Sequence, residues 1–257
     1  MKPYITIIGK SIPTYGICMV LGIFSACIIA GIRVNKRNLD LNNLFVIAAC
    51  TIGIAILGAK ILFVIVTYGL EKVLVSLLHF DFTLFSNSGL VFYGGLIGGI
   101  VGAFVGAIIS GIKKQRASYC EAIIPGVPIG HAIGRVGCLM AGCCYGLPYH
   151  GRFAVTLPAA GIDYSVFPIQ LVESLINICI GLFLIITSKR KYTGYAVLFV
   201  YLALYSIMRF VLEFFRGDTI RGIYFGLSTS QWVSLMLLVI SVLLITIGNM
   251  KNERKPT

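Results

Sequence analysis

Charged residues are scarce in this chain of 257 residues, where Asp, Glu, Lys and Arg together make up 12% of the sequence. Soluble globular domains carry about 25% charged residues. Hydrophobic residues make up 58% of the chain. This composition excludes an ordinary soluble domain and predicts an integral membrane protein.

The sequence also lacks internal repeats, low-complexity tracts and polar linkers, so we expect a single polytopic membrane domain over residues 1–257. The first residues, MKPYITIIGKSIP, contain a short apolar stretch that Lys10 and Pro13 interrupt, and no small-residue cleavage site follows. They do not predict a cleaved signal peptide.

Acidic residues number only 9 against 21 basic residues, which gives a formal net charge of +12. The basic residues stand mostly in short loops beside apolar runs, which is typical of membrane topology and not of nucleic-acid binding. With the N-terminus outside, twelve of them fall on the cytoplasmic side and six fall outside. The cytoplasmic set is Arg33, Lys36, Arg37, Lys113, Lys114, Arg116, Lys189, Arg190, Lys191, Lys251, Arg254 and Lys255. We expect an outside N-terminus, a cytoplasmic C-terminus and no nucleic-acid partner.

Long apolar runs predict an all-α membrane protein with seven transmembrane helices, since about 20 residues cross a bilayer. The expected spans are residues 12–32, 44–66, 89–112, 118–146, 168–187, 194–215 and 228–249. Pro125, Pro128 and several glycines predict that the fourth span is broken. Residues 70–87 are too polar to cross and predict an amphipathic segment at the interface, with His79 and Asp81 towards water.

Most of the eight cysteines lie in apolar runs, which argues against a disulfide framework. Cys138, Cys143 and Cys144 stand close together, but zinc sites usually use a C-x2-C pair, so their spacing does not predict a metal site. Packing of small side chains is favoured there, while a disulfide and a thiol made reactive by Arg135 stay open. No cofactor is expected.

Charged residues inside apolar spans are candidate functional positions, because each costs about 2.5–3.5 kcal/mol in contact with lipid. They are Lys60, Glu121, Arg135, Glu173, Arg209 and Glu213. Arg209 and Glu213 are four residues apart and share a helix face with Tyr205, so they form either a structural ion pair or an anion site.

Three arginines, Arg135, Arg209 and Arg216, lie near the outer ends of their spans under this topology. Converging guanidinium groups suit a phosphate, which within a membrane is most simply a phospholipid head group. Ordinary head-group contact is the alternative. Tyr15 is either an interfacial residue or part of the site, and Gln170 begins the fifth span one helical turn before Glu173. These last two side chains can face one cavity.

Five motifs in order make the chain resemble the prolipoprotein diacylglyceryl transferases, a family of bacterial inner-membrane enzymes. They are TYG at 14–16, FYGGLIGG at 92–99, GRVG at 134–137, PIQLVE at 168–173 and RFVLEFFR at 209–216. The resemblance implies a seven-helix fold in the bacterial plasma membrane. It also implies transfer of a diacylglyceryl group from phosphatidylglycerol to the lipobox cysteine thiol of a preprolipoprotein, at the outer face of the membrane.

The resemblance extends to individual site positions. Those that match are Tyr15, Arg135, Gly146, Tyr205, Arg209 and Glu213. It implies that Arg135 and Arg209 bind the lipid phosphate and stabilise the leaving group, with Glu213 orienting Arg209. We expect Gln170, Glu173 and Arg216 to complete the substrate-binding set.

Three positions depart from the family pattern. Tyr93 stands where the family has a histidine, Cys138 where it has an asparagine, and Cys143 where it has a glutamate. The lipid-binding half is kept and the acid–base half is changed, as in a divergent paralogue, so these three are the altered catalytic positions. Two other hypotheses stay open: lipid transfer to a different acceptor, and a membrane thiol or sulfur carrier that uses Cys138, Cys143 and Cys144.

Overall fold

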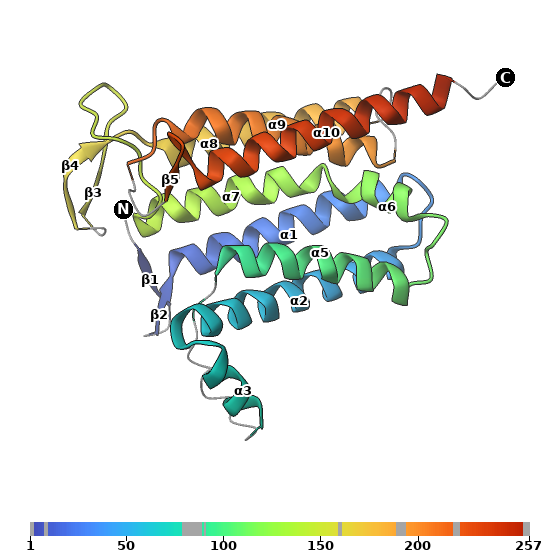
Figure 1. Ribbon diagram of the computed structural model, residues 1–257, viewed down its shortest axis with the longest axis horizontal. Coiled ribbons are helices and arrows are strands. Elements are labelled where there is room, and N and C mark those ends of the chain that lie inside the picture. Colours follow the sequence, from blue (N-terminus) through green and yellow to red (C-terminus); the bar gives the residue numbers. More distant parts are fainter. Residues whose placement is uncertain are drawn as a thin grey trace. The chain divides into compact units, whose positions relative to one another are not determined.

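Apolar helices make up most of the protein in its computed structural model. The structure describes residues 3–7, 10–78, 89, 91–158, 161–188, 194–217 and 222–253. The helices are α1 (Thr14–Asn35), α2 (Leu41–Tyr68), α3 (Leu70–Leu78), α5 (Phe92–Ile109), α6 (Arg116–Ile123), α7 (Gly126–Ala141), α8 (Ile169–Thr187), α9 (Ala196–Glu213) and α10 (Thr229–Glu253) (Figure 1). Among the described residues, six apolar segments are long enough to cross a membrane, and Tyr93–Ile109 is a shorter apolar helix. The all-α membrane class is confirmed, while the count of seven spans stays a prediction.

Three short antiparallel hairpins accompany the helices in the described ranges. They are β1 (Tyr4–Ile7) with β2 (Lys10–Pro13), β3 (Val155–Leu157) with β4 (Ile162–Val166), and β5 (Ile223–Tyr224) with β6 (Leu227–Ser228). The sequence predicts only a polar loop over residues 147–167. The β3–β4 hairpin forms there because Leu157, Ile162 and Val166 bury their side chains with Leu139 of α7.

The fourth span is broken, as predicted. Helix α6 ends at Ile123 and α7 begins at Gly126, with Pro125 in the turn between them. Proline has no N–H to donate and its ring crowds the preceding turn, so a regular helix does not continue through it. Pro128 lies in the first turn of α7, where the backbone N–H groups have no partner within the helix.

The expected interfacial segment begins as the short helix α3, which follows the end of α2 at Gly69. His79 and Asp81 lie outside the described residues. The same is true of several basic residues used to assign the topology, namely Lys2, Lys189, Arg190, Lys191, Arg221, Arg254 and Lys255. The orientation of the chain in the membrane stays a prediction.

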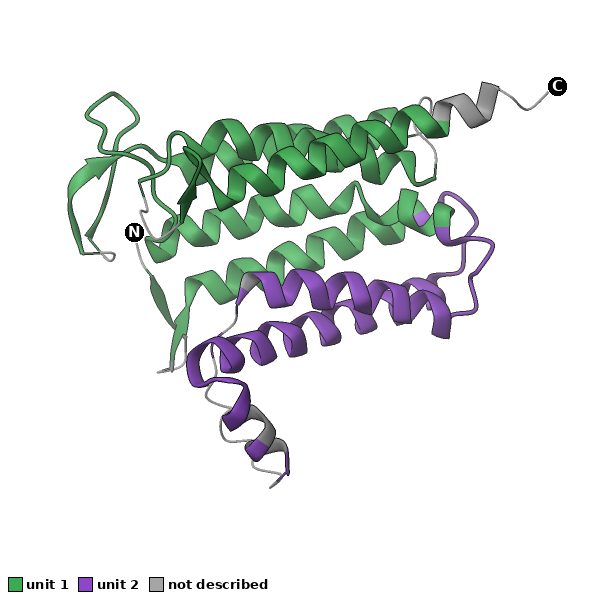
Figure 2. Ribbon diagram, in the orientation of Figure 1, with its two compact units in different colours: residues 1–33, 117–257 green, residues 34–116 purple. Residues whose placement is uncertain are grey.

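The chain divides into two compact units, residues 34–116 and residues 1–33 with 117–257 (Figure 2). In the second unit, α7 packs against α8, and α9 packs against both α8 and α10. Small residues let α1 approach α7, because a Cβ on Gly22 would lie 2.5 Å from the carbonyl oxygen of Gly130. This unit carries the clustered polar residues described below.

In the unit of residues 34–116, α2 and α5 pack along their length. Glycines at every fourth position of α5 allow this contact. A Cβ on Gly94 would lie 2.3 Å from the carbonyl oxygen of Gly58, and a Cβ on Gly98 would lie 2.3 Å from that of Ile54. The glycines of FYGGLIGG therefore serve helix packing, as small residues commonly do in membranes.

Arg33, at the end of α1, is buried, although its position after the first span predicts a flanking charge in a loop. Its guanidinium donates to the carbonyl oxygens of Glu121 at 3.1 Å and Ala122 at 3.2 Å, and to Ser188 Oγ at 2.5 Å. The Glu121 carboxylate accepts the N–H of Gly194 at 2.9 Å. These bonds give Arg33 and Glu121 a structural role.

We expect Gly98→Val to destabilise the packing of α2 on α5, because the new side chain would meet the Ile54 backbone. Overpacking of this kind costs about 1–3 kcal/mol, so the thermal unfolding midpoint in detergent should fall by several degrees. Gly53→Val on α2 is the matched control, since nothing described lies within 4 Å of its Cβ. Equal losses in both variants would contradict this role for Gly98.

Candidate functional site

Glu173, near the start of α8, joins arginines from two other helices. Its side chain is 2% exposed and forms an ion pair with Arg135 of α7. Its Oε1 also lies 3.0 Å from Nη1 of Arg209, on α9. A buried charge without a partner costs several kcal/mol, so these three groups hold α7, α8 and α9 in one register.

A second carboxylate, Glu213, extends this arrangement. Its Oε2 lies 2.7 Å from Nη2 of Arg209 and 3.9 Å from Nε of Arg216. Arg209 Nη2 also donates to Ser230 Oγ of α10 at 3.2 Å. The result is a series of alternating charges from Arg135 to Arg216, which we call the charged row: Arg135, Glu173, Arg209, Glu213 and Arg216.

Ser228, directly before α10, holds the carboxylate of Glu213 through a hydrogen bond. Ser228 Oγ accepts the N–H of Gln231 at 3.2 Å, while Gln231 Oε1 accepts the N–H of Ser228 at 2.9 Å. The same hydroxyl donates to Glu213 Oε1 at 2.9 Å. Site motifs in the sequence do not single out Ser228 or Ser230, although S-x-x-Q in STSQ marks a helix capping box.

Backbone pairing places Arg216 beside the loop that follows α7. Gly146 and Arg216 form an antiparallel bridge, and Leu147 N donates to the carbonyl of Phe215 at 3.0 Å. A Cβ on Gly146 would lie 2.5 Å from the carbonyl oxygen of Phe167, so a larger residue does not fit. Gly146 thus allows the close approach that positions Arg216.

Gln170 and Tyr15 lie at the same end of the unit as the charged row. Gln170 is fully buried, and its Nε2 donates to the carbonyl of Cys143 at 2.8 Å. Tyr15, the second residue of α1, lies against α7, where a Cβ on Gly137 would be 3.4 Å from its ring. Gly137 and Arg135 both lie in the second half of α7, so Tyr15 and that arginine lie at the same end of the packed helices.

Tyr205 lies on α9, one turn before Arg209 of the charged row, and its ring contacts His131 of α7. Its ring centroid lies 5.5 Å from that of His131 and 6.0 Å from that of Tyr201. His131 precedes Arg135 by one turn, just as Tyr205 precedes Arg209. Sequence patterns give His131 no role, and the structure makes it a neighbour of the site.

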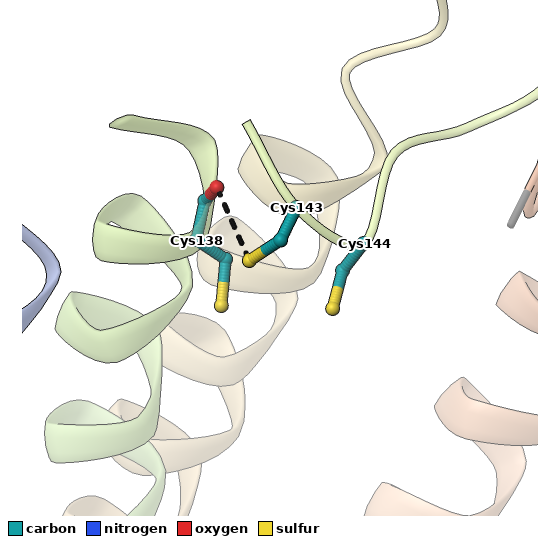
Figure 3. A group of neighbouring side chains, drawn as sticks. All are labelled: Cys138, Cys143 and Cys144. Atoms are coloured by element: carbon teal, nitrogen blue, oxygen red, sulfur yellow. Dashed lines mark hydrogen bonds between the residues drawn. The ribbon is translucent and has the colours of Figure 1, made fainter. Parts of the chain in front are cut away.

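Three cysteines meet at the end of α7 (Figure 3). Cys138 lies in the last turn of the helix, Cys143 and Cys144 lie in the following loop, and their Sγ atoms are all within 4.8 Å of one another. Arg135 Nη1 lies 3.6 Å from Cys138 Sγ. We call these three residues the thiol cluster, and it adjoins the Arg135 end of the charged row.

Hydrogen bonds within the thiol cluster act in opposite directions on the two loop thiols. Bonds with Cys138 and Cys143 hold the pKa of Cys144 below its ordinary value, and Arg135 and Arg216 act in the same direction. Bonds with Cys138 and Cys144 raise the pKa of Cys143, as does its partial burial.

Three further sequence candidates are Tyr93, Lys60 and Glu121. Tyr93, in the first turn of α5, and Lys60, on α2, belong to the unit of residues 34–116. Glu121 is joined to Gly194, as described above. The catalytic role expected of Tyr93 stays a prediction.

Comparison with known proteins gives one family over nearly the whole chain. The family model described as prolipoprotein diacylglyceryl transferase matches residues 3–247. Phosphatidylglycerol–prolipoprotein diacylglyceryl transferase 2 of Clostridium perfringens is 32% identical over 252 residues, which cover 97% of this chain and 96% of that protein. A phosphatidylglycerol–prolipoprotein diacylglyceryl transferase of Clostridium tetani is 29% identical over 98% of this chain and 100% of its own length, and one of Finegoldia magna is 29% identical over 93% and 92%. The chain belongs to the prolipoprotein diacylglyceryl transferase family.

Proposed function

We propose that this protein transfers a diacylglyceryl group from phosphatidylglycerol to the lipobox cysteine of a preprolipoprotein. Its membership of the family supports the reaction class, and the names of its relatives state both substrates. The charged row is the structural observation that carries the proposal, because it supplies a buried group of guanidiniums where a lipid phosphate can bind.

The charges of this row suit a phosphodiester. Three arginines face two carboxylates, which leaves one positive charge for the single negative charge of the phosphatidylglycerol phosphate. Arg135 Nε is buried without a hydrogen-bond partner in the described structure, and so is Oε1 of Gln170. A bound polar ligand would satisfy both atoms, which would otherwise cost about 1–3 kcal/mol each.

The proposed reaction is a substitution at the glyceryl carbon that carries the phosphate. The acceptor thiol loses its proton to water, and its sulfur then bonds to that carbon. The carbon–oxygen bond breaks, so that glycerol phosphate leaves with the electron pair. Arg135 and Arg209 stabilise the charge that grows on the leaving oxygen. Glu213, held by Ser228, orients Arg209.

The site lies near the ends of α7 and α9 and near the starts of α8 and α10. Under the expected topology this is the outer end of the bundle, in the bacterial plasma membrane, where phosphatidylglycerol and a preprolipoprotein meet. Tyr15, Gln170 and Tyr205 would contact the bound substrates, with Gly146 allowing Arg216 to approach them.

The gathered cysteines favour one second candidate, a thiol or sulfur carrier. A relay of sulfur between Cys138, Cys143 and Cys144 needs no phosphate site, so mutation of Arg209 should then matter little. The charged row favours lipid transfer, since a sulfur relay gives no reason to gather three arginines around two carboxylates.

We expect the purified protein, incubated with phosphatidylglycerol and a lipobox peptide, to give a diacylglyceryl thioether detected by mass spectrometry. Arg209→Lys should lower the rate by about 10²-fold or more, because a lysine cannot reproduce the paired donors. Arg152→Lys, at an exposed position of the same unit, should leave it unchanged. Absence of product with the wild-type protein would refute the proposed reaction.

A second test uses lipid binding. We expect Glu173→Gln to lower the thermal unfolding midpoint, because loss of one partner of a buried ion pair costs about 3–5 kcal/mol. Phosphatidylglycerol should then raise the midpoint more than it does in the wild type, since its phosphate replaces the missing charge, and phosphatidylcholine should not. Glu71→Gln, exposed on α3, is the control. An identical lipid effect in the wild type and Glu173→Gln would show that the phosphate does not meet these arginines.

A further inference from the structure

We propose that the thiol cluster binds a zinc ion through Cys138, Cys143 and Cys144 and leaves the fourth position of the metal open for the acceptor thiol. The metal site follows from the geometry of the cluster alone. The role of the open position rests on the proposed function.

The end of α7 explains why thiols five residues apart meet. Gly142 has a left-handed φ of 77° and donates to the carbonyl of Leu139, while Cys143 N donates to the carbonyl of Cys138 at 3.1 Å. These two bonds define a Schellman motif, which brings the residue after the glycine back against the last turn of the helix. A C-x4-C spacing, unlike that of common zinc sites, therefore becomes a close pair of thiols at a helix C-terminus.

The third thiol is brought in by an unusual backbone conformation. Cys144 has a φ of 58°, which costs a residue other than glycine about 1–3 kcal/mol. The surrounding structure maintains it: Gln170 holds the carbonyl of Cys143, and the Gly146–Arg216 bridge holds the chain just beyond. Such strain is concentrated at functional sites.

The dimensions and composition of the cluster suit zinc. Tetrahedral zinc with Zn–S bonds of about 2.3 Å holds its sulfurs about 3.8 Å apart, and these sulfurs already lie within 4.8 Å of one another. Thiolates select soft ions, and zinc among these is not redox-active. Three thiolates leave the complex with one negative charge, and the guanidinium of Arg135 lies beside it, with Nη1 3.6 Å from Cys138 Sγ.

The ligand number indicates a catalytic site. Within the described residues no fourth His, Cys, Asp or Glu joins the group. Structural zinc sites have four protein ligands, whereas catalytic sites have three and an open position. Cys143 is exposed, so an incoming thiol can approach from its side.

An open zinc position would supply what the acceptor requires. A thiol that coordinates zinc loses its proton to water and remains bound as a thiolate. That thiolate forms the sulfur–carbon bond while glycerol phosphate departs to the arginines. Two of the three ligands, Cys138 and Cys143, are positions where the chain departs from the family pattern, so the metal would replace the acid–base groups lost there.

Metal binding is tested first, without lipid. The reduced, metal-free protein should bind one Co²⁺ with a near-ultraviolet sulfur-to-cobalt charge-transfer band, and Zn²⁺ should displace it. Cys138→Ser, Cys143→Ser and Cys144→Ser should each weaken binding at least tenfold, while Cys179→Ser, an exposed cysteine on α8, should not. No band, a band that survives in the triple variant, or a disulfide between two of the three cysteines in protein purified without oxidant would overturn the site.

The acceptor role has a separate readout. A lipobox peptide should strengthen the charge-transfer band of the cobalt-loaded protein by adding a fourth thiolate, and the same peptide with serine for its cysteine should not. An unchanged band would overturn this role and leave the metal site standing. A stronger band with no thioether from phosphatidylglycerol would refute the proposed reaction alone, and full transfer by the metal-free triple variant would refute the zinc mechanism alone.

Discussion

The ion pairs of Glu173 are the constraint on which the site depends. One buried carboxylate meets Arg135 from α7 and Arg209 from α9, so three helices must adopt the register that brings these groups together. Within a membrane, water does not solvate such charges, so a shifted helix would leave at least one of them buried and unpaired. Glu213 and the cap of α10 then extend the same constraint to a fourth helix.

Apolar run lengths predict the all-α membrane class, and the prolines predict the break before α7, while the count of seven spans stays a prediction. The pairing of Arg209 with Glu213 also follows from their spacing. The thiol cluster does not, because it depends on how α7 ends: the left-handed Gly142 and Cys144 reverse the chain, and spacing alone does not show that. Likewise, Ser228 meets Glu213 only through the packing of α10 on α9.

Several residues that motifs or intramembrane charge mark as candidates stabilise the fold and take no part in the charged row. The glycines of FYGGLIGG allow α5 to lie against α2. Glu121, an intramembrane charge, holds the N–H of Gly194, and Arg33 binds carbonyl groups at the end of α6. A charged side chain inside a span needs a hydrogen-bond or ion-pair partner. The identity of that partner shows whether the charge serves the fold or the site.

The bridging position of Glu173 has a kinetic consequence. If the lipid phosphate binds these arginines as proposed, the carboxylate competes with it, and because it is covalently part of the protein it never diffuses away. It would disfavour anions that bind weakly, and it would form its ion pairs with both arginines again once the reaction is over. The carboxylate that assembles the three helices would thereby also promote the release of glycerol phosphate and reset the enzyme for its next turnover.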